Sequence, residues 1–361
     1  SLTPPWIVGP TPTWWSSWAR ISASTAEGAG LRVVAAPDKF RGTASAAEVA
    51  AAVAQSVVDA GGFAVEVPMA DGGEGTLEAL GGPNRTTRVT GPLGRPVEAS
   101  WRLDGSTAVI EMALTSGLLL AGGLDGNRAL DATTAGTGEL IRLAVEQGAR
   151  RVLVGMGGSA TTDGGLGALR AMGSPARYRG VDLLVACDVR TSFVEAAEVF
   201  GPQKGASPAE VEFLRRRLER LAQVYDEEYG VAVGDLARAG AAGGLAGGLA
   251  AIGASLVDGV DLVADELALD ELVDGVDLVV SGEGYLDASS FEGKVVGGVA
   301  AHATALAVPL FVVAGRVDPE VAARVDAVSL VESFGEERAL HDTLGCVAQA
   351  VSARLTGGPT R

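Results

Sequence analysis

The sequence has few of the residues on which several common classes of active site depend. Cys187 and Cys346 are its only cysteines, without a Cys-x-x-Cys pair, and His302 and His341 are the only histidines among 361 residues. Disulfide frameworks and structural zinc sites are therefore not supported, and His-based triads and zinc hydrolase motifs are nearly excluded. Isolated cysteines also fit a reducing cytoplasm, which is the localisation that we expect.

Positive charge and long apolar runs are also scarce. The chain carries 28 basic against 45 acidic residues and a formal charge of −17, whereas nucleic acids and anionic membranes bind basic surfaces. No apolar stretch reaches the ~20 residues of a membrane-spanning helix. We therefore expect neither nucleic acid nor a membrane as partner, and leave a homodimer open. A bound anion must be held locally, by backbone N–H groups, a few cations or a metal ion.

Glycine, by contrast, is abundant, with 51 of 361 residues, about twice the usual ~7%. Many glycines directly follow short apolar runs, at Leu31–Ala36, Val65–Pro68, Arg151–Val154 and Leu278–Val280. This pattern is typical of β–loop–α units in a mostly parallel sheet. Alternating strands and turns between 85 and 112 predict antiparallel hairpins instead.

Two helix starts carry recognisable caps. Ser45 with Glu48 forms a capping box that predicts a helix to about Ala60. Ser207-Pro208 puts proline at the first position of a helix that we expect to run to about Tyr229.

The alternation of these patterns predicts an α/β fold with two domains. Residues 31–85 plus 275–361 are expected to form a discontinuous flavodoxin- or Rossmann-like parallel-sheet domain. Residues 86–274 are expected to form a second, mixed α/β domain inserted into the first. Residues 1–30 hold four of the five tryptophans among Pro, Ser and Thr, and we interpret them as a poorly ordered, atypical extension.

Lysine is rare even among the basic residues. Lys39, Lys204 and Lys294 are the only lysines, and all three lie in glycine-containing, turn-like segments. An ammonium group is a good point-charge partner for phosphate. We expect at least two of them to contact an anionic ligand, with Lys204 and Lys294 balancing nucleotide charge; solvated loop charges are the alternative.

Residues 155–165 form the clearest glycine-rich loop, between a predicted strand and a predicted helix at Leu166–Met172. Glycines let backbone N–H groups approach phosphate oxygens, and hydroxyl groups add donors. The loop is not a Walker A motif, and it matches the dinucleotide pattern only loosely. The candidates for nucleotide binding are Gly157, Gly158, Ser159, Thr161 and Asp163. A tight structural turn is the alternative.

A second glycine-rich segment, which contains Gly243 and Gly244, is open to two interpretations. It lets a helix start approach a nucleotide, or it allows close helix packing. We include both glycines among the candidates for cofactor binding.

A third group of candidates consists of carboxylates that follow predicted strands. Acids from several parallel strands converge at the carboxyl edge of a sheet. They suit Mg²⁺, which prefers one or two carboxylates plus substrate phosphates. The members are Asp38, Asp71, Glu74, Asp188, Glu283 and Asp287. Each alone is more often a cap or a solvated turn residue, but together they predict a metal or proton-transfer site, with Asp71, Glu283 and Asp287 as metal candidates.

Several consecutive motifs, in order from about Leu31 to Gly315, resemble those of bacterial type I glycerate kinases. They include APDKFRG, MADGGEG, GMGGSATTDGG, ACDV, FGPQKGA, GAAGGLAGG and SGEGYLD. The resemblance implies an enzyme with two α/β domains around a cleft, a flavodoxin-like one and an inserted one. It further implies ATP-dependent phosphorylation of D-glycerate, usually to 2-phosphoglycerate.

The chain departs from the family pattern in loops to which the resemblance assigns the substrate. Lys39 and Arg41 stand where the family usually has Ser and Lys, Arg190 and the three residues after it replace an Asp-Asn-Pro segment, and Tyr285 replaces Arg. A nucleotide-binding relative with altered or lost specificity is therefore one alternative, and a dinucleotide-dependent oxidoreductase is another.

Direct transfer of the γ-phosphoryl group of ATP needs positioning and charge neutralisation more than covalent catalysis. In this hypothesis Arg41 holds the substrate carboxylate, and Asp188 orients the substrate or accepts its proton. The catalytic candidates are Asp38, Arg41, Asp71, Asp188 and Lys294, with ATP and Mg²⁺ as cofactors.

Overall fold

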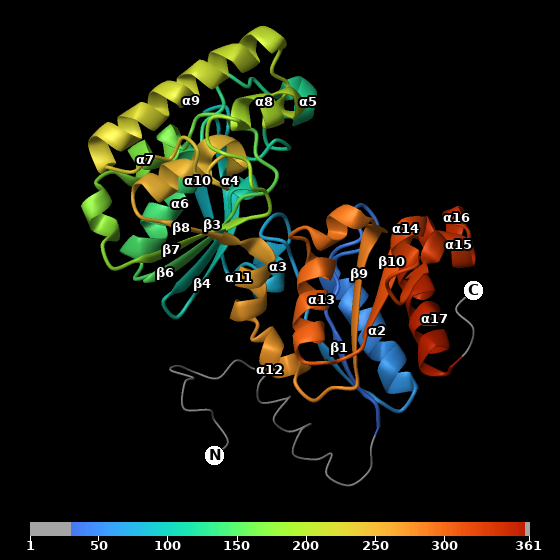
Figure 1. Ribbon diagram of the computed structural model, residues 1–361. Coiled ribbons are helices and arrows are strands. Elements are labelled where there is room, and N and C mark those ends of the chain that lie inside the picture. The colour runs from blue at the N-terminus through green and yellow to red at the C-terminus, as the bar shows by residue number, and fades with distance from the viewer. Residues whose placement is uncertain (1–29, 358–361) are drawn as a thin grey trace. The chain divides into compact units, whose positions relative to one another are not determined.

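The computed structural model describes residues 30–357, which form two compact units (Figure 1). Unit 1 comprises residues 30–68, 268–288 and 299–357, and unit 2 comprises residues 69–267 and 289–298. The expected extension lies outside the described residues, apart from Gly30.

The limits of the units differ from the expected domain boundaries. Residues 69–85 and 289–298 belong to unit 2, although we expected them in the flavodoxin-like domain. Residues 268–274 belong to unit 1, although we expected them in the inserted domain. The first difference has a clear physical reason, because the glycine loop that begins at Asp71 packs on strand ends of unit 2.

Unit 1 contains a five-stranded parallel sheet with the order β2-β1-β9-β10-β11. The strands are β1 (Arg32–Ala35), β2 (Phe63–Glu66), β9 (Leu278–Leu286), β10 (Leu310–Val317) and β11 (Ala327–Ser329). Numbered along unit 1 alone, this is the order 2-1-3-4-5 of flavodoxin-like folds. The expected flavodoxin-like sheet is thereby confirmed. Its topological switch point lies between β1 and β9, where the strand order changes direction.

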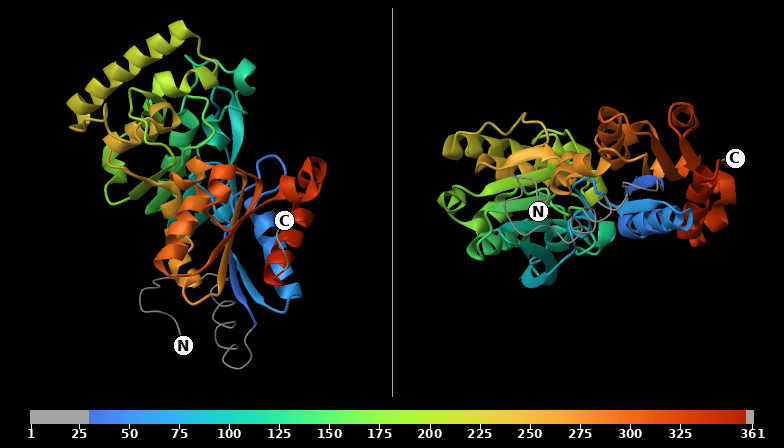
Figure 2. Two further views of the ribbon diagram at one scale, coloured as in Figure 1. Left: turned by 45° about the vertical axis from the view of Figure 1, so that its right-hand side comes forward. Right: turned by 90° about the horizontal axis from the view of Figure 1, so that it is seen from below.

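Helices cover both faces of this sheet. They are α2 (Ala46–Asp59), α12 (Leu269–Val273), α13 (Val295–Ala305), α14 (Pro319–Ala322), α15 (Leu330–Phe334), α16 (Glu336–His341) and α17 (Thr343–Leu355). The first turn of α13 and most of η3 (Ala288–Phe291), which precedes it, fall within residues 289–298 and so belong to unit 2. Helices α2 and α17 pack side by side on one face, as two views show (Figures 1 and 2). Right-handed crossovers that leave β1 and β9 in opposite directions put α2 and α13 on opposite faces.

The core of unit 1 follows from the strand pattern. Val33, Val280 and Val313 pack against α2 and α17, whereas the alternate residues Val34 and Val312 are buried too. Parallel strands that are covered on both faces are apolar almost throughout, as these are. The capping box of Ser45 is present at the start of α2 and confirms the expected helix start.

Unit 2 contains a six-stranded mixed sheet with the order β3-β4-β5-β6-β7-β8. The strands are β3 (Arg85–Thr90), β4 (Pro96–Asp104), β5 (Thr107–Glu111), β6 (Arg151–Gly155), β7 (Asp182–Cys187) and β8 (Ser255–Asp258). The first two pairings are antiparallel, which confirms the expected hairpins, and β5 to β8 are parallel.

The helices of unit 2 pack on both faces of its sheet. They are α3 (Thr76–Ala79), α4 (Ala113–Ser116), α5 (Gly123–Gly126), α6 (Ala135–Glu146), α7 (Leu166–Met172), α8 (Ala196–Phe200), α9 (Pro208–Tyr229), α10 (Ala241–Ala251) and α11 (Gly259–Glu266), with short η1 (Pro175–Tyr178) and η2 (Pro202–Lys204). The large core around Trp101 lies under α6, α7, α9 and α10. A smaller core on the other face includes Leu77 of α3 and Leu262 of α11.

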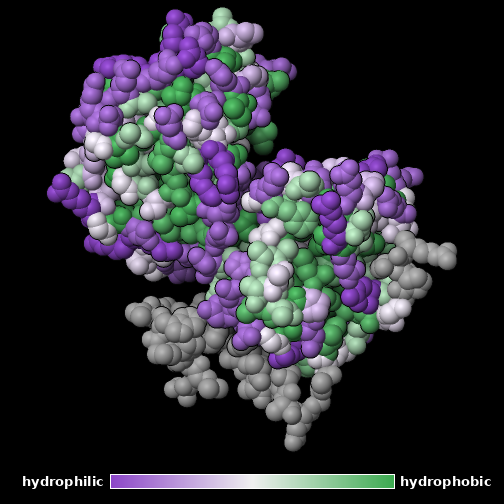
Figure 3. Space-filling view, viewed as in Figure 1, coloured by the Kyte–Doolittle hydropathy of each residue, from purple (hydrophilic) through white to green (hydrophobic). Residues whose placement is uncertain are grey.

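The long helix α9 begins at the expected residue. Ser207 forms a capping box with Glu210, and Pro208 occupies the first helical position. Its exposed side is charged, and the space-filling view is hydrophilic along this helix (Figure 3). Among the described residues, no helix has the length and hydropathy that a bilayer crossing requires.

Candidate active site

The carboxyl ends of the parallel strands in unit 2 are covered by the loop Asp71–Gly75. A Cβ atom on Gly72 would lie 2.7 Å from that of Ala186 and 2.8 Å from Gly259 Cα, and one on Gly157 would lie 2.7 Å from Gly73 Cα. Such close approach leaves no room for a Cβ atom on Gly72 or Gly157. The loop is therefore fixed against the ends of β6, β7 and β8, and it brings Asp71 to this edge.

Glu111, the last residue of β5, anchors the same loop. Its Oε1 accepts hydrogen bonds from the backbone N–H groups of Gly75 at 3.0 Å and Leu77 at 2.7 Å. The side chain is buried, and bonds from N–H groups to a carboxylate are the strong, charge-assisted kind. The sequence hypothesis missed Glu111, although an acid at the end of a buried strand is the signal used for the other candidates.

The predicted loop 155–165 divides into an accessible turn and a buried second half. Gly158 is exposed, Gly157 and Ser159 are partly exposed, and Thr161 and Asp163 are buried. The turn is held by Leu118 N, which donates to Gly158 O at 2.9 Å, and by Ala160 N, which donates to Ser116 O at 3.0 Å. The first three candidates thus lie where a ligand can reach them, at the carboxyl end of β6.

The buried half of the loop is occupied by contacts within unit 2. The Asp163 carboxylate accepts hydrogen bonds from Thr134 N and Oγ1 and from the N–H groups of Gly165 and Gly167. Thr161 Oγ1 donates to Ala242 O at 3.2 Å. These side chains shape the loop, and the structure does not bring them to its accessible side.

Gly243 and Gly244 also lie behind the loop. Both have positive φ, 68° and 90°, and a Cβ atom on Gly243 would lie 1.9 Å from Thr161 O. Gly164 N donates to Gly243 O at 3.1 Å. The structure therefore favours the close-packing interpretation for this pair over direct contact with a nucleotide.

Lys204 is buried, with 3% of its surface exposed, so the structure does not present its ammonium group to a nucleotide. Nζ donates to Thr161 O at 2.7 Å and lies 5.7 Å from the centre of the Phe200 ring. Burial lowers the pKa of Lys204 to about 7, and the charge of Asp163 opposes this shift. Asn127 Nδ2 donates to both Ala160 O and Lys204 O, at 2.9 and 2.8 Å. Lys204 and Asn127 therefore stabilise the loop by donating to the backbone carbonyl groups of its buried half.

A cluster of charges surrounds the carboxyl ends of β7 and β8. The Arg238 guanidinium contacts Cys187 O at 3.5 Å and Asp258 Oδ2 at 3.3 Å, and exposed Asp188 follows Cys187. Burial raises the pKa of the Cys187 thiol to about 12, so this thiol is not ionised at neutral pH. Sequence reasoning found Asp188 and missed Arg238, which precedes a glycine-rich helix and carries no local signal.

Lys294 lies on a segment that reaches the same edge of unit 2. Its Nζ donates to Ser289 Oγ at 2.6 Å. A Cβ atom on the preceding residue, Gly293, would lie 3.6 Å from Asp258 Oδ2. Four of the predicted site elements therefore lie at this edge of unit 2, namely Asp71, the Gly157–Ser159 turn, Asp188 and Lys294.

The remaining candidates lie at the switch point of unit 1. Asp38 N donates to Gly282 O at 2.8 Å, and a Cβ atom on Gly284 would lie 3.6 Å from Arg41 N. The loop after β1 therefore runs along β9, with Arg41 exposed and Glu283 buried. Asp287 follows the end of β9. Asp38, Arg41 and Glu283 lie together in unit 1, at the position where flavodoxin-like folds bind ligands.

The metal candidates do not form a ready-made metal site within the part of the chain that the structure describes, because no group of three or more His, Cys, Asp or Glu side chains there has the arrangement to hold an ion. Mg²⁺ bound with a nucleotide needs only one or two carboxylates besides the phosphates. Asp71 fits that requirement: it is partly exposed, and its Oδ1 accepts from Gly73 N at 3.1 Å.

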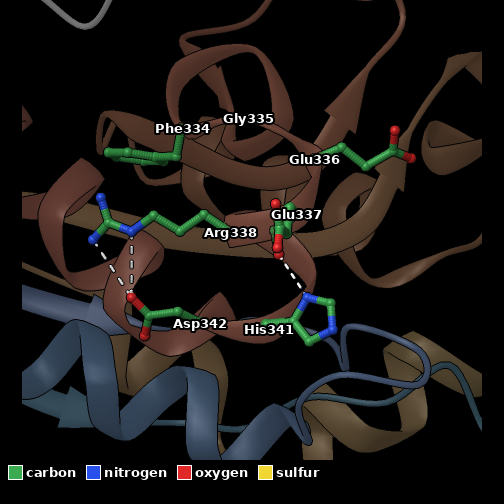
Figure 4. Close-up of a pocket in the computed structure, with 7 residues that line it drawn as sticks. All are labelled: Phe334, Gly335, Glu336, Glu337, Arg338, His341 and Asp342. Atoms are coloured by element: carbon green, nitrogen blue, oxygen red, sulfur yellow. Dashed lines mark hydrogen bonds and ion pairs between the residues drawn. The ribbon is translucent and has the colours of Figure 1, made fainter.

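A pocket in unit 1 lies apart from these candidates in the sequence. It is lined by residues 334–338, 341 and 342, and two pairs of its polar groups contact each other (Figure 4). Arg338 contacts Asp342 Oδ2 at 3.4 Å, and His341 Nδ1 lies 2.8 Å from Glu337 O. The predicted site residues do not line it, so the pocket is not the candidate active site.

Glycine turns and carboxylates at the carboxyl edges of parallel strands are typical of α/β proteins that bind phosphorylated ligands. The chain belongs to the glycerate kinase family, whose model matches residues 33–176 and 174–353. The resemblance deduced from the motifs is thereby confirmed. Membership in a kinase family implies that the protein uses a nucleotide.

Individual relatives agree with this assignment. The chain is 37% identical to glycerate 2-kinase of Escherichia coli K12, over 91% of this chain and 99% of that protein. It is also 37% identical to glycerate kinase of Bacillus subtilis 168, over 80% of this chain and 85% of that one. A crystal structure named for glycerate kinase 2 of Salmonella typhimurium LT2 superposes with a TM-score of 0.77 and 33% identity, covering 91% and 98% of the two chains.

Proposed function

We propose that the protein is a glycerate kinase that transfers the γ-phosphoryl group of ATP to D-glycerate, giving 2-phosphoglycerate and ADP. The observation that carries the proposal is the accessible Gly157–Ser159 turn at the end of β6, in a chain that aligns with a glycerate 2-kinase over almost its whole length. Family membership favours phosphoryl transfer over the dinucleotide-dependent alternative.

The residues of unit 2 supply the means to hold a nucleotide. Backbone N–H groups at Gly157 and Gly158 and the Ser159 hydroxyl are suited to phosphate oxygens, and Lys294 contributes a positive charge. Asp71 is the proposed partner for Mg²⁺. When bound, Mg²⁺ would neutralise negative charge on the transferring phosphoryl oxygens.

The chemical step needs a group that takes the proton of the acceptor hydroxyl. The hydroxyl oxygen forms a bond to the γ-phosphorus, the bond from that phosphorus to the bridging oxygen of ADP breaks, and the proton passes to a base. We assign the role of this base to Asp188, which lies at the end of β7. Asp38, Arg41, Glu283 and Asp287 in unit 1 stay candidates for binding the acceptor or the metal.

An ADP-release assay with D-glycerate, ATP and Mg²⁺ tests the proposal, and NMR of the product distinguishes the 2- from the 3-phosphate. Asp71→Asn should lower kcat by about 10²–10³-fold, the typical cost of one preorganised charge contact. Asp131→Asn is the matched control, because Asp131 is an exposed carboxylate of the same unit that pairs with Arg128. ATP binding without phosphorylation of any hydroxy acid in a panel would instead identify a non-catalytic relative.

The two free cysteines among the described residues, both buried, are consistent with action in the cytoplasm, which we include in the proposal.

A further inference from the structure

Arg238 has an unusual backbone conformation for a charged residue. Its φ is 72°, and the three other non-glycine residues with positive φ in residues 30–357 are all alanines. This left-handed region is unfavourable for residues that carry a Cβ atom, and glycine adopts it without steric cost. The fold thus holds a long cationic side chain at a position where glycine would be less strained.

The backbone around Arg238 fixes the direction of the side chain. Arg238 N donates to Arg190 O at 3.3 Å, and Gly240 N donates to Thr191 O at 3.0 Å. The segment before α10 is therefore tied to the loop that follows β7, which is the loop in which this chain departs from its family pattern.

The guanidinium group spans the ends of two neighbouring parallel strands. Cys187 and Asp258, which it contacts, are register partners and the last residues of β7 and β8. Both contacts are long, at 3.5 and 3.3 Å, and the side chain is 21% exposed. A guanidinium carries five N–H donors, so two long contacts leave most of them for a ligand. The carboxyl ends of parallel strands are where α/β sheets bind ligands.

Acidic side chains flank this guanidinium group, so a small anion that binds here needs its positive charge. Asp188 and Asp258 lie close enough to affect the Cys187 thiol electrostatically, as does Arg238. A carboxylate that approached these acids without a cation would be repelled, particularly in a molecule with a formal charge of −17. Arginine meets a carboxylate in bidentate geometry, which lysine cannot reproduce.

We propose that Arg238 binds the carboxylate of the acceptor and so selects hydroxy acids over uncharged alcohols, with the acceptor hydroxyl directed toward Asp188. The proposal rests on the proposed kinase function and adds an acceptor-binding residue from unit 2 that the sequence motifs did not indicate.

The test compares Arg238→Gly with the parent protein. Glycine suits a φ of 72°, so the variant should fold with equal or higher melting temperature. Calorimetric binding of D-glycerate should weaken by about 10–100-fold, the usual range for a charge-assisted contact. KM for D-glycerate should rise similarly while KM for ATP stays within about twofold. Arg179→Gly is the matched control, because Arg179 is an exposed loop residue of the same unit.

The amide analogue glyceramide separates carboxylate binding from a structural effect. The parent protein should prefer D-glycerate to glyceramide, and Arg238→Gly should lose most of this preference, whereas Arg238→Lys should recover part of it. An Arg238→Gly protein with unchanged D-glycerate affinity and unchanged discrimination overturns the inference. A parent protein that binds D-glycerate through Arg238 but releases no ADP refutes the kinase function instead, so the two failures are distinguishable.

Discussion

Replacing the buried Lys204 with methionine should change how the stability of unit 2 depends on pH. Methionine has a similar length and no charge, so the variant removes the ammonium group that donates to Thr161 O. The pKa of Lys204 is about 7 in the folded protein against a reference value of 10.5. Between these values the unfolded chain binds more protons than the folded one, so stability that depends on Lys204 rises with pH.

The magnitude follows from the two pKa values. The free-energy cost of burying Lys204 is about 4 kcal/mol at pH 7 and about 2 kcal/mol at pH 9. Other titrating groups are common to both proteins and cancel in the comparison. The free energy of unfolding of the parent protein, relative to Lys204→Met, should therefore increase by about 2 kcal/mol from pH 7 to pH 9.

The two cysteines provide an assay that follows each unit separately. Cys187 lies in the core of unit 2 and Cys346 in the core of unit 1, and burial raises the pKa of both thiols. Urea unfolding with a short thiol-labelling pulse, read by peptide mass spectrometry, reports when each thiol becomes accessible. The Cys187 transition gives the free energy of unit 2.

Arg216→Met serves as the control, because Arg216 is also a cation of unit 2 but its side chain is 64% exposed. Its difference from the parent protein should not vary between pH 7 and pH 9. A difference between the parent protein and Lys204→Met that is equally independent of pH would refute the reasoning, since it would mean that Lys204 keeps its ordinary pKa in the folded state.

Three further predictions concern the packing that supports the candidate site. Gly243→Ala should destabilise unit 2 by more than about 3 kcal/mol in the same urea assay, since its Cβ would lie 1.9 Å from Thr161 O. The control Gly230→Ala, at φ 72° with no neighbour within 4 Å, should lower the free energy of unfolding by only about 1–2 kcal/mol. Equal losses in the two variants would contradict the clash. Glu111→Gln should cost about 1–3 kcal/mol in that assay, because two N–H groups lose a charged acceptor; an unchanged urea midpoint would argue against this anchor. Asn127→Leu should raise KM for ATP more than KM for D-glycerate, because Asn127 ties the glycine loop to Lys204, and an equal effect on both would point to general loss of folding.

Local patterns predicted most of the fold because they act over a few residues. The capping boxes at Ser45 and Ser207 fixed two helix starts, and apolar runs followed by glycine marked the parallel strands. The unit limits were not predictable in this way. The loop at Asp71 belongs to unit 2 because Gly72 packs on Ala186 and Gly259, residues more than a hundred positions away in the chain.

The candidate site shows the same division. Residue types located the glycine loop, but they could not tell its accessible turn from its buried half, because a loop has no period that separates inside from outside. Asp163 is buried by its bonds to Thr134, and Lys204 is oriented by its bond to Thr161. Asp163 and Thr134, like Lys204 and Thr161, are far apart in the sequence, so only the tertiary structure reveals these pairs.

The scarcity of lysine led us to expect that at least two of the three ammonium groups contact an anionic ligand, and the structure separates two of them. The ammonium group of Lys204 is buried and donates to Thr161 O of the glycine loop. Lys294 instead lies at the edge of unit 2, since the residue before it, Gly293, lies close to Asp258. Arg238 contacts the same aspartate. Lys294 and Arg238 stand there against Asp71, Asp188 and Asp258, so this edge carries only a small negative charge in a molecule whose formal charge is −17. An anionic substrate must therefore contact one of these cations directly, because the surrounding charge does not attract it, and binding does not require a basic surface.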